Sequence, residues 1–255
     1  MRSDVAVGAA SPDVLQERIV SRDVAKRLFD VVGAAALLLV LSPVLVCLSI
    51  AIKLDSRGTV LFRCRRIGRH GNEFAMLKFR KMRTGVSGAT LTIAGDERFT
   101  RFGRLLAATK FDELPQLWNV LKGEMSLVGP RPEDAEIVRL HQDEYAPILE
   151  VRPGVTGLCQ LAYAKEGAIL DRDDRVRDYV ERLLPQKMSI DKLYVGTRSF
   201  SMDLRILGWT LIVVAIRRDV AVGRTTARLS VRRSRGFLGH PDRRNATRRL
   251  DRRCS

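Results

Sequence analysis

The apolar segment over residues 28–52 constrains the fold of this 255-residue chain more than any other feature, because it carries a single charge, Asp30, near its start. As one α-helix it would reach roughly 37 Å, which exceeds the hydrocarbon core of a bilayer at about 30 Å. A polar stretch precedes it, and no signal-peptide cleavage motif follows it at a suitable distance. We therefore predict a polar leader over residues 1–25 and a retained membrane helix over residues 26–53.

Ser42 and Pro43 lie in the middle of this segment. Pro43 cannot donate to the carbonyl of Leu39, and Ser42 can bond back to the carbonyl of Leu38, so we predict a sharp kink. A kinked helix can cross the bilayer or leave by the face it entered, and composition alone favours the crossing form. Basic residues flank both ends of the segment, which is compatible with both ends facing the cytoplasm.

The formal charge of the chain is +16, and residues 223–255 supply +9 of it with eleven arginines against two aspartates. Such a balance indicates an acidic partner, which can be nucleic acid, anionic lipid or a phosphorylated substrate. No groove-reading helix, zinc-finger spacing or aromatic RNA-binding motif is recognisable, so we expect no nucleic-acid partner. Residues 218–255 are predicted to form a disordered Arg-rich tail or to adhere loosely to anionic membrane lipids.

The polar body over residues 54–217 contains both strand and helix patterns. The stretches GTVLFRCRRIG and NEFAMLKFRKM have strand-like composition, and RHGN between them is a turn signal, which predicts a β-hairpin. Over residues 99–121, apolar side chains recur at three- and four-residue steps, as in amphipathic helices. Their apolar faces can pack on a core or lie in the membrane interface. The expected fold class is α+β and mainly helical, and the last apolar run, 207–216, is too short to cross a bilayer.

Two adjacent carboxylates, Asp112 and Glu113, interrupt this basic sequence just before Pro115. Adjacent acids on a helix point about 100° apart, so they cannot share a proton, but they can take different roles around one phosphate. One carboxylate can attack phosphorus while the other holds a hard cation such as Mg²⁺. Taken alone, the pair can also be read as solvated acids at a helix end.

Several basic residues are candidates for phosphate contacts around this acid pair. Two loops rich in proline and glycine, SLVGPRPED and VRPGVTGLCQ, each place an arginine in stiffened backbone. A guanidinium fork in such a loop suits a phosphate, although a solvated arginine in a turn is the alternative interpretation. The candidates are Lys78, Arg80, Lys110, Arg131 and Arg152.

The ordered motifs KR, SP, KFRKM, GDERFTRFGR, DELPQLWNVLKGEMSLVGPRPE and RPGVTG closely resemble those of the bacterial sugar transferase family, also called monotopic phosphoglycosyl transferases. The resemblance covers residues 26–210. It implies a priming enzyme of the bacterial cytoplasmic membrane that moves a sugar phosphate from a UDP-sugar to undecaprenyl phosphate and releases UMP. The product would begin an exopolysaccharide or another surface glycoconjugate. Residues 54–217 would then be the catalytic domain, with its active site on the cytoplasmic face.

The resemblance also implies roles for individual residues. Asp112 would be the nucleophile that forms a covalent phosphosugar intermediate, and Glu113 would assist the binding of Mg²⁺. The pair Ser42 and Pro43 would break the membrane helix into a re-entrant one, which replaces the crossing form favoured by composition. Phosphate contacts would come from Lys78, Arg131 and Arg152.

The chain departs from the family pattern near the acid pair. Ala107 stands where arginine is usual, and Lys110 stands where serine is usual. Because three residues separate neighbouring positions on a helix face, we predict that a phosphate contact has moved from residue 107 to Lys110. Cys64 and Glu97 stand where glutamine and proline are common. These departures and the tail leave a non-enzymatic membrane scaffold or regulator on the same fold as the alternative function.

Overall fold

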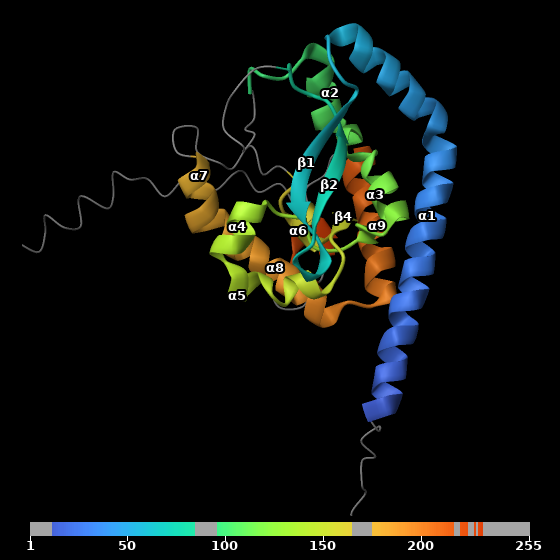
Figure 1. Cartoon of the computed structure of the whole chain (residues 1–255), viewed down its shortest axis with the longest axis vertical. Helices are drawn as coiled ribbons and strands as arrows, with labels where there is room; N and C mark the ends of the chain where they lie inside the picture. The colour runs from blue at the N-terminus through green and yellow to red at the C-terminus, as the bar shows by residue number, and fades with distance from the viewer. Residues whose placement is uncertain are drawn as a thin grey trace, which may run out of the picture.

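The computed structural model describes residues 12–84, 96–164, 175–216, 220–223, 227 and 229–231. Figure 1 shows a long N-terminal helix lying along one side of a mixed body of helices and short strands. Within the described residues the strands form three separate two-stranded sheets, and helices predominate. The predicted fold class, mainly helical α+β, is therefore confirmed.

Helices and short strands are interspersed along the chain. The helices are α1 (Pro12–Asp55), α2 (Arg101–Thr109), α3 (Gln116–Lys122), α4 (Ala135–Leu140), α5 (Gln142–Tyr145), α6 (Leu158–Ala162), α7 (Arg175–Asp178), α8 (Leu184–Thr197) and α9 (Phe200–Ile216). The strands are β1 (Leu61–Ile67), β2 (Glu73–Phe79), β3 (Ser126–Val128), β4 (Gly154–Thr156), β5 (Val220–Val222) and β6 (Leu229–Val231). Short turns of other helix types are η1 (Arg69–Gly71), η2 (Phe111–Glu113), η3 (Ile148–Glu150) and the π-helical turn η5 (Tyr179–Leu183).

Helix α1 begins inside the predicted leader and continues without interruption through Pro43. Pro43 has no N–H for the carbonyl of Leu39, and the hydroxyl of Ser42 donates to that same carbonyl at 2.8 Å. The predicted acceptor was the carbonyl of Leu38, so the back-bond is shifted by one residue. Ser42 thus satisfies the carbonyl that Pro43 leaves unpaired, and the helix is continuous at the position where the family resemblance implies a break. Figure 1 shows its axis curving toward the C-terminal end, and a re-entrant path through a bilayer stays a prediction.

The apolar surface of α1 is mostly uncovered. By length and composition, the part over Asp23–Asp55 can cross a membrane, and only 6% of its most apolar 18-residue window is buried inside the protein. Leu39 and Val40 are 76% and 73% exposed. An apolar helix that the protein itself does not cover fits contact with lipid, which supports membrane association of the chain.

The basic start of the membrane helix is fixed to the body by ionic contacts. The ammonium of Lys26 lies 3.1 Å from a carboxylate oxygen of Asp30 and 3.1 Å from one of Asp203 in α9. Arg27 donates to the carbonyl of Val120 at 2.7 Å, near the C-terminus of α3. Buried carboxylates and helix-end carbonyls are thus paired with cations, which ties α1 to α3 and α9.

Strands β1 and β2 form the predicted hairpin, with antiparallel register from Leu61 opposite Phe79 to Ile67 opposite Glu73. The turn contains His70 and Gly71 at positive φ. Along β2, Phe74 and Met76 are buried, and Lys78 follows them on the same face with the period of two. The hairpin therefore directs Lys78 toward the helices that pack on β2.

Asn119 connects α3 to the hairpin. Its side-chain amide donates to the carbonyl of Ala75 at 2.8 Å, and its side-chain oxygen accepts from the backbone N–H of Leu77 at 3.0 Å. Asn119 is fully buried and also donates to Glu124 at 2.6 Å. These bonds hold the segment that follows the acid pair against the strand that carries Lys78.

The remaining strands and helices complete the hydrophobic core, and two of the strands lie within the predicted tail. The parallel pair β3 and β4 packs with α6 and α9, and its core includes Val128, Leu158 and Ile206. Helix α9 contains the last apolar run, residues 207–216, in which Leu211 is 72% exposed. Ile206, just before this run, is fully buried. Within the predicted tail, residues 218–255, β5 pairs with β6, and Val222 and Leu229 pack on the core, so this short part of the tail has regular structure. Residues 232–255 lie outside the described part of the chain.

Candidate active site

The acid pair lies in the short turn η2 between α2 and α3. Lys110 ends α2 in the left-handed conformation, with φ of 63°, and its carbonyl accepts from the backbone N–H of Glu113 at 3.1 Å. This sharp turn separates the directions of the two acids. Asp112 is 1% exposed, whereas Glu113 is only partly buried. Two acids that are adjacent in sequence therefore meet different surroundings.

Each carboxylate has its own cationic partners. Lys81 donates to Oδ2 of Asp112 at 2.8 Å, and Lys78 donates to Oε1 of Glu113 at 3.1 Å. Arg131 also lies 3.6 Å from Oε1 of Glu113. The predicted association of Lys78 and Arg131 with the acid pair is thus present in the structure. A phosphate entering here would meet three cations and two potential oxygen ligands for a metal.

Lys81 is the residue that our reading of the sequence missed. It lies three positions after Lys78 in the motif KFRKM, and strand alternation places such residues on opposite faces. Strand β2 ends at Phe79, however, so the alternation stops before Lys81. The second lysine of the motif KFRKM could have pointed to this residue. That it reaches Asp112 becomes clear only from the structure, in which β2 ends before Lys81.

The electrostatics of Glu113 are dominated by its neighbours. Burial by itself raises the pKa of this carboxyl, but the charges of Lys78, Arg131 and Lys110 outweigh burial and hold the pKa well below its usual range. Burial lowers the pKa of Lys78, an effect that Glu113 opposes and the nearby cations reinforce. Glu113 is therefore ionised at neutral pH, as a ligand for a divalent cation must be.

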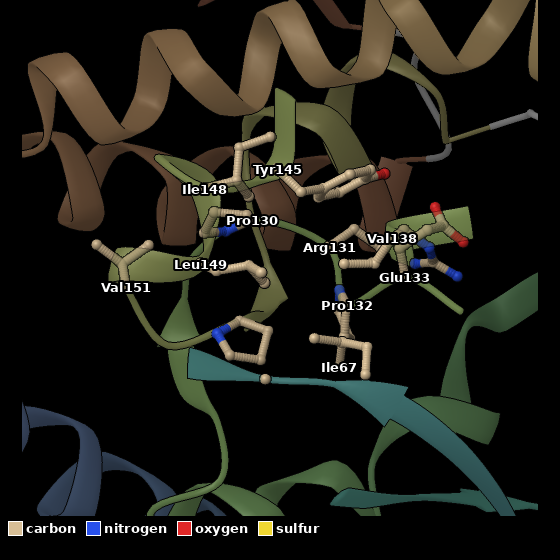
Figure 2. A pocket seen from close by; sticks show the side chains of 12 residues that line it. Ile67, Pro130, Arg131, Pro132, Glu133, Val138, Tyr145, Ile148, Leu149 and Val151 are labelled. Atoms are coloured by element: carbon tan, nitrogen blue, oxygen red, sulfur yellow. The ribbon is translucent and has the colours of Figure 1, made fainter. Parts of the chain in front are cut away.

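Arg131 is held in the rigid loop over Pro130, Arg131 and Pro132. Figure 2 shows this loop beside a narrow apolar hollow, with the polar ends of Arg131 and Glu133 together at one edge. The cavity measures ≈ 10 Å³, which is about the room that one water molecule needs. A nucleotide cannot enter it, so this hollow is not the binding site of a nucleotide donor.

Arg80, a predicted phosphate ligand, is directed instead at the end of the membrane helix. It is 5% exposed, and its guanidinium donates to the carbonyls of Ile52, Ser56 and Arg57 at 3.2, 2.6 and 2.5 Å. These are carbonyls at and just beyond the C-terminus of α1, where unpaired acceptors and the helix dipole attract a cation. Arg80 thus joins α1 to the end of β2.

Arg152, another predicted phosphate ligand, lies at the opposite end of α3 from the acid pair. It donates to the carbonyl of Gly123 at 3.0 Å, next to the carbonyls that accept from Arg27. Burial lowers the pKa of Arg152, and the positive charges of Arg69 and Arg27 add to this effect. In this structure Arg152 is a cap of α3 and is not brought together with Asp112.

Lys110 and Ala107 were predicted to be neighbours on one helix face, but the structure does not place them there. Ala107 is inside α2, but Lys110 leaves the helix in a left-handed conformation and is exposed. The turn into η2 is the physical reason, because the chain must reverse direction to place the acids. Lys110 still lowers the pKa of Glu113 through its charge, whereas the ion pair with Asp112 comes from Lys81.

The acid pair fits a magnesium ion by the chemistry of its donors. No cluster of three or more His, Cys, Asp or Glu side chains that could hold a metal is present among the described residues. Mg²⁺ does not require such a cluster, because it usually keeps several waters and binds through one or two carboxylates together with substrate phosphates. Asp112 and Glu113 supply hard oxygen ligands of this kind, and the surrounding cations suit the phosphates.

The fold and the site together define a membrane-associated protein in which two adjacent acids are paired with Lys78, Lys81 and Arg131. A family model described as bacterial sugar transferase matches residues 21–217. The chain therefore belongs to the bacterial sugar transferase family.

Curated relatives agree with this assignment. A UDP-glucose:undecaprenyl-phosphate glucose-1-phosphate transferase of Caulobacter vibrioides is 42% identical over 197 residues, which cover 74% of this chain and 68% of the relative. The exopolysaccharide production protein PSS of Rhizobium leguminosarum is 39% identical over 198 residues, or 74% of this chain and 94% of the relative. An undecaprenyl-phosphate glucose phosphotransferase of Komagataeibacter xylinus is 39% identical over 224 residues, or 84% of this chain. The chain spans only 39% of that last protein.

Proposed function

We propose that this protein transfers a sugar phosphate from a UDP-sugar to undecaprenyl phosphate, releases UMP, and so begins the synthesis of an exopolysaccharide or another surface glycoconjugate. The named Caulobacter relative makes UDP-glucose the first donor to test. The observation that carries the proposal is the acid pair, in which Asp112 and Glu113 have separate cationic partners. A solvated pair at a helix end would not be enclosed in this way.

The two acids divide the work of the first step. A carboxylate oxygen of Asp112 attacks the phosphorus that carries the sugar, a P–O bond to UMP breaks, and UMP leaves with the bonding electrons. The phosphosugar is then bound covalently to Asp112. Lys78 and Arg131, which both contact Glu113, would stabilise negative charge on the phosphate oxygens. Mg²⁺ held by Glu113 would neutralise further charge on the diphosphate.

The second step restores the enzyme. An oxygen of undecaprenyl phosphate attacks the phosphorus of the covalent intermediate, the bond to Asp112 breaks, and the carboxylate is regenerated. The acceptor is a membrane lipid, and α1 offers an uncovered apolar surface to the bilayer. Because UDP-sugars are made in the cytoplasm, we place the active site on the cytoplasmic face of the bacterial cell membrane.

The covalent intermediate is the direct test. The full-length protein, purified in detergent, is incubated with UDP-glucose and Mg²⁺ without a lipid acceptor and then analysed by mass spectrometry. We expect a glucose-phosphate adduct on Asp112, together with one equivalent of UMP. Asp112→Asn should abolish both, because an amide is a poor nucleophile.

Two results would contradict this mechanism. UMP release that persists in Asp112→Asn would show that another group attacks the donor. UMP release that requires undecaprenyl phosphate in the wild-type protein would show direct transfer without an enzyme intermediate. Absence of UMP release with every UDP-sugar in a panel would favour a scaffold or regulatory role instead.

A further inference from the structure

The backbone of Lys81 is fixed by the start of α2. Its carbonyl accepts from the backbone N–H of Thr100 at 3.1 Å, and a Cβ added to Gly103 would come within 1.9 Å of the same carbonyl oxygen. Met82 and Phe99 form a β-bridge next to it. The ammonium of Lys81 also lies 5.8 Å from the centre of the Phe99 ring. The side chain of Lys81 therefore extends from a rigid base.

The exposure of the two partners shows how Lys81 covers Asp112. The side chain of Asp112 is 2% exposed, whereas the side chain of Lys81 that pairs with it is 26% exposed. The ammonium is thus part of the surface that closes over the carboxylate. A carboxylate held in this way is oriented, but Oδ2 is occupied by the hydrogen bond from Lys81.

The geometry of attack places the donor phosphate next to the same ammonium. In a reactive arrangement the phosphorus must lie about 3–3.5 Å from the attacking oxygen. Lys81 Nζ is 2.8 Å from Oδ2 of Asp112, so the non-bridging oxygens of that phosphate fall within reach of its flexible four-carbon side chain. No other cation forms an ion pair with Asp112 among the described residues.

We propose that Lys81 is a catalytic residue that exchanges partners, holding Asp112 before the donor binds and moving to the phosphate oxygens when Asp112 attacks. This role rests on the proposed function. In the attack, the new bond joins a carboxylate oxygen of Asp112 to phosphorus, the bond to UMP breaks, and UMP carries away the electron pair. Lys81 keeps its protons and contributes only positive charge to the phosphate oxygens.

The proposal separates Lys81 from the other lysines of the site. Lys78 is paired with Glu113, and Lys110 is exposed and acts on Glu113 through its charge. The missing family arginine at Ala107 is therefore replaced by Lys81, which lies two residues after the end of β2, and not by Lys110 at the end of α2. Loss of Lys81 should slow the chemical step more than loss of Lys110.

The test measures adduct formation in a single turnover. Full-length wild type, Lys81→Met, Lys81→Arg, Lys110→Met and Lys192→Met are mixed with UDP-glucose and Mg²⁺ in detergent, without lipid acceptor, over a range of donor concentrations. Lys192 is an exposed lysine on α8, so Lys192→Met is the matched control. Thermal unfolding of every variant shows whether the fold is kept.

We expect the limiting rate of Lys81→Met at saturating donor to fall about 100-fold, as for loss of a charge-stabilising donor in a transition state. Lys81→Arg should stay within about tenfold of wild type, because the positive charge is kept, and Lys192→Met should be unchanged. A Lys81→Met protein that forms adduct at the wild-type rate would overturn the role of Lys81 alone. So would a folded Lys81→Arg protein as slow as Lys81→Met. A wild-type protein that forms no adduct with any donor would instead overturn the proposed function.

Discussion

The guanidinium of Arg80 lies 2.6 Å from the carbonyl oxygen of Ser56 and closes the end of the membrane helix onto the end of strand β2. The residue after Arg80 is Lys81, which contacts the nucleophile candidate Asp112. The membrane helix and the acid pair are thus connected through two consecutive residues. A change in the position of either residue would therefore be transmitted directly to the other.

The first prediction is that Arg80 contributes chiefly to stability. Arg80→Lys keeps the charge but cannot reach three carbonyls at once, so it should lower the free energy of unfolding by about 2–3 kcal/mol. Denaturant unfolding in detergent measures this change, with Arg104→Lys on the exposed face of α2 as the control. If Arg80→Lys is as stable as wild type but needs a higher donor concentration for half-saturation, Arg80 binds phosphate instead.

The second prediction concerns Arg152, which caps α3 in this structure. Arg152→Met leaves the carbonyl of Gly123 without its cation, so we expect a loss of about 1–3 kcal/mol in unfolding free energy. The half-saturating concentration of UDP-sugar should change less than twofold. Arg131→Met is the contrasting variant, since Arg131 contacts Glu113. Its half-saturating concentration of UDP-sugar should rise. If both variants raise the half-saturating concentration of UDP-sugar equally, the assignment of Arg152 as a cap is disproved.

The third prediction is a dependence of stability on pH that comes from Asp191 in α8. Burial raises the pKa of Asp191 to about 8, with Lys187 opposing and Glu133 reinforcing the shift, and its Oδ1 has no hydrogen-bond partner among the described residues. The unfolded chain has an ordinary aspartate that loses its proton near pH 4. Between about pH 4 and pH 8 the native state therefore binds more protons, and this group lowers stability as pH rises.

Asp191→Asn removes this group and tests the sign. The variant should gain stability relative to wild type, and the gain should be larger at pH 8 than at pH 5, as measured by unfolding midpoints. Asp143→Asn, at an exposed position, is the control and should show no such trend. A stability difference between Asp191→Asn and wild type that stays constant from pH 5 to pH 8 would refute the prediction.

The fourth prediction assigns the metal to Glu113. Glu113→Gln should leave a folded protein that needs more Mg²⁺. Loss of a residue that only supports a metal ligand raises the half-saturating metal concentration about 10- to 100-fold, and loss of Glu113 should raise it at least as much. Adduct formation titrated with Mg²⁺ measures this shift. The exposed Glu144 offers a control in Glu144→Gln. An unchanged Mg²⁺ titration for Glu113→Gln would exclude Glu113 as a ligand.

The fifth prediction is that α1 enters and leaves the bilayer on the cytoplasmic side. Cysteines placed singly in the leader and at Arg57 should both be protected from a membrane-impermeant thiol reagent in intact cells, after replacement of the exposed Cys47. Labelling at one position only would establish a helix that crosses the bilayer. Pro43→Ala restores the backbone donor to the carbonyl of Leu39, so it should straighten α1 and convert part of the population to the crossing form.

Local sequence patterns predicted several of the elements and drew attention to the acid pair. The long apolar run predicted α1, the turn signal RHGN predicted the hairpin, and the adjacent Asp112 and Glu113 pointed to phosphate chemistry. These features depend on side-chain polarity, periodicity and turn propensity, which are properties of neighbouring residues and can be read from the chain alone.

The partners of the charged residues were decided by the tertiary structure. Lys81 reaches Asp112 because β2 ends at Phe79, and Lys110 misses it because α2 ends in a left-handed residue. Arg80 and Arg152 lie at the C-termini of α1 and α3, whose carbonyls attract cations once packing has brought them near. A basic residue in sequence can serve a phosphate or a helix end equally well, and only long-range packing determines which acceptor lies within hydrogen-bonding distance.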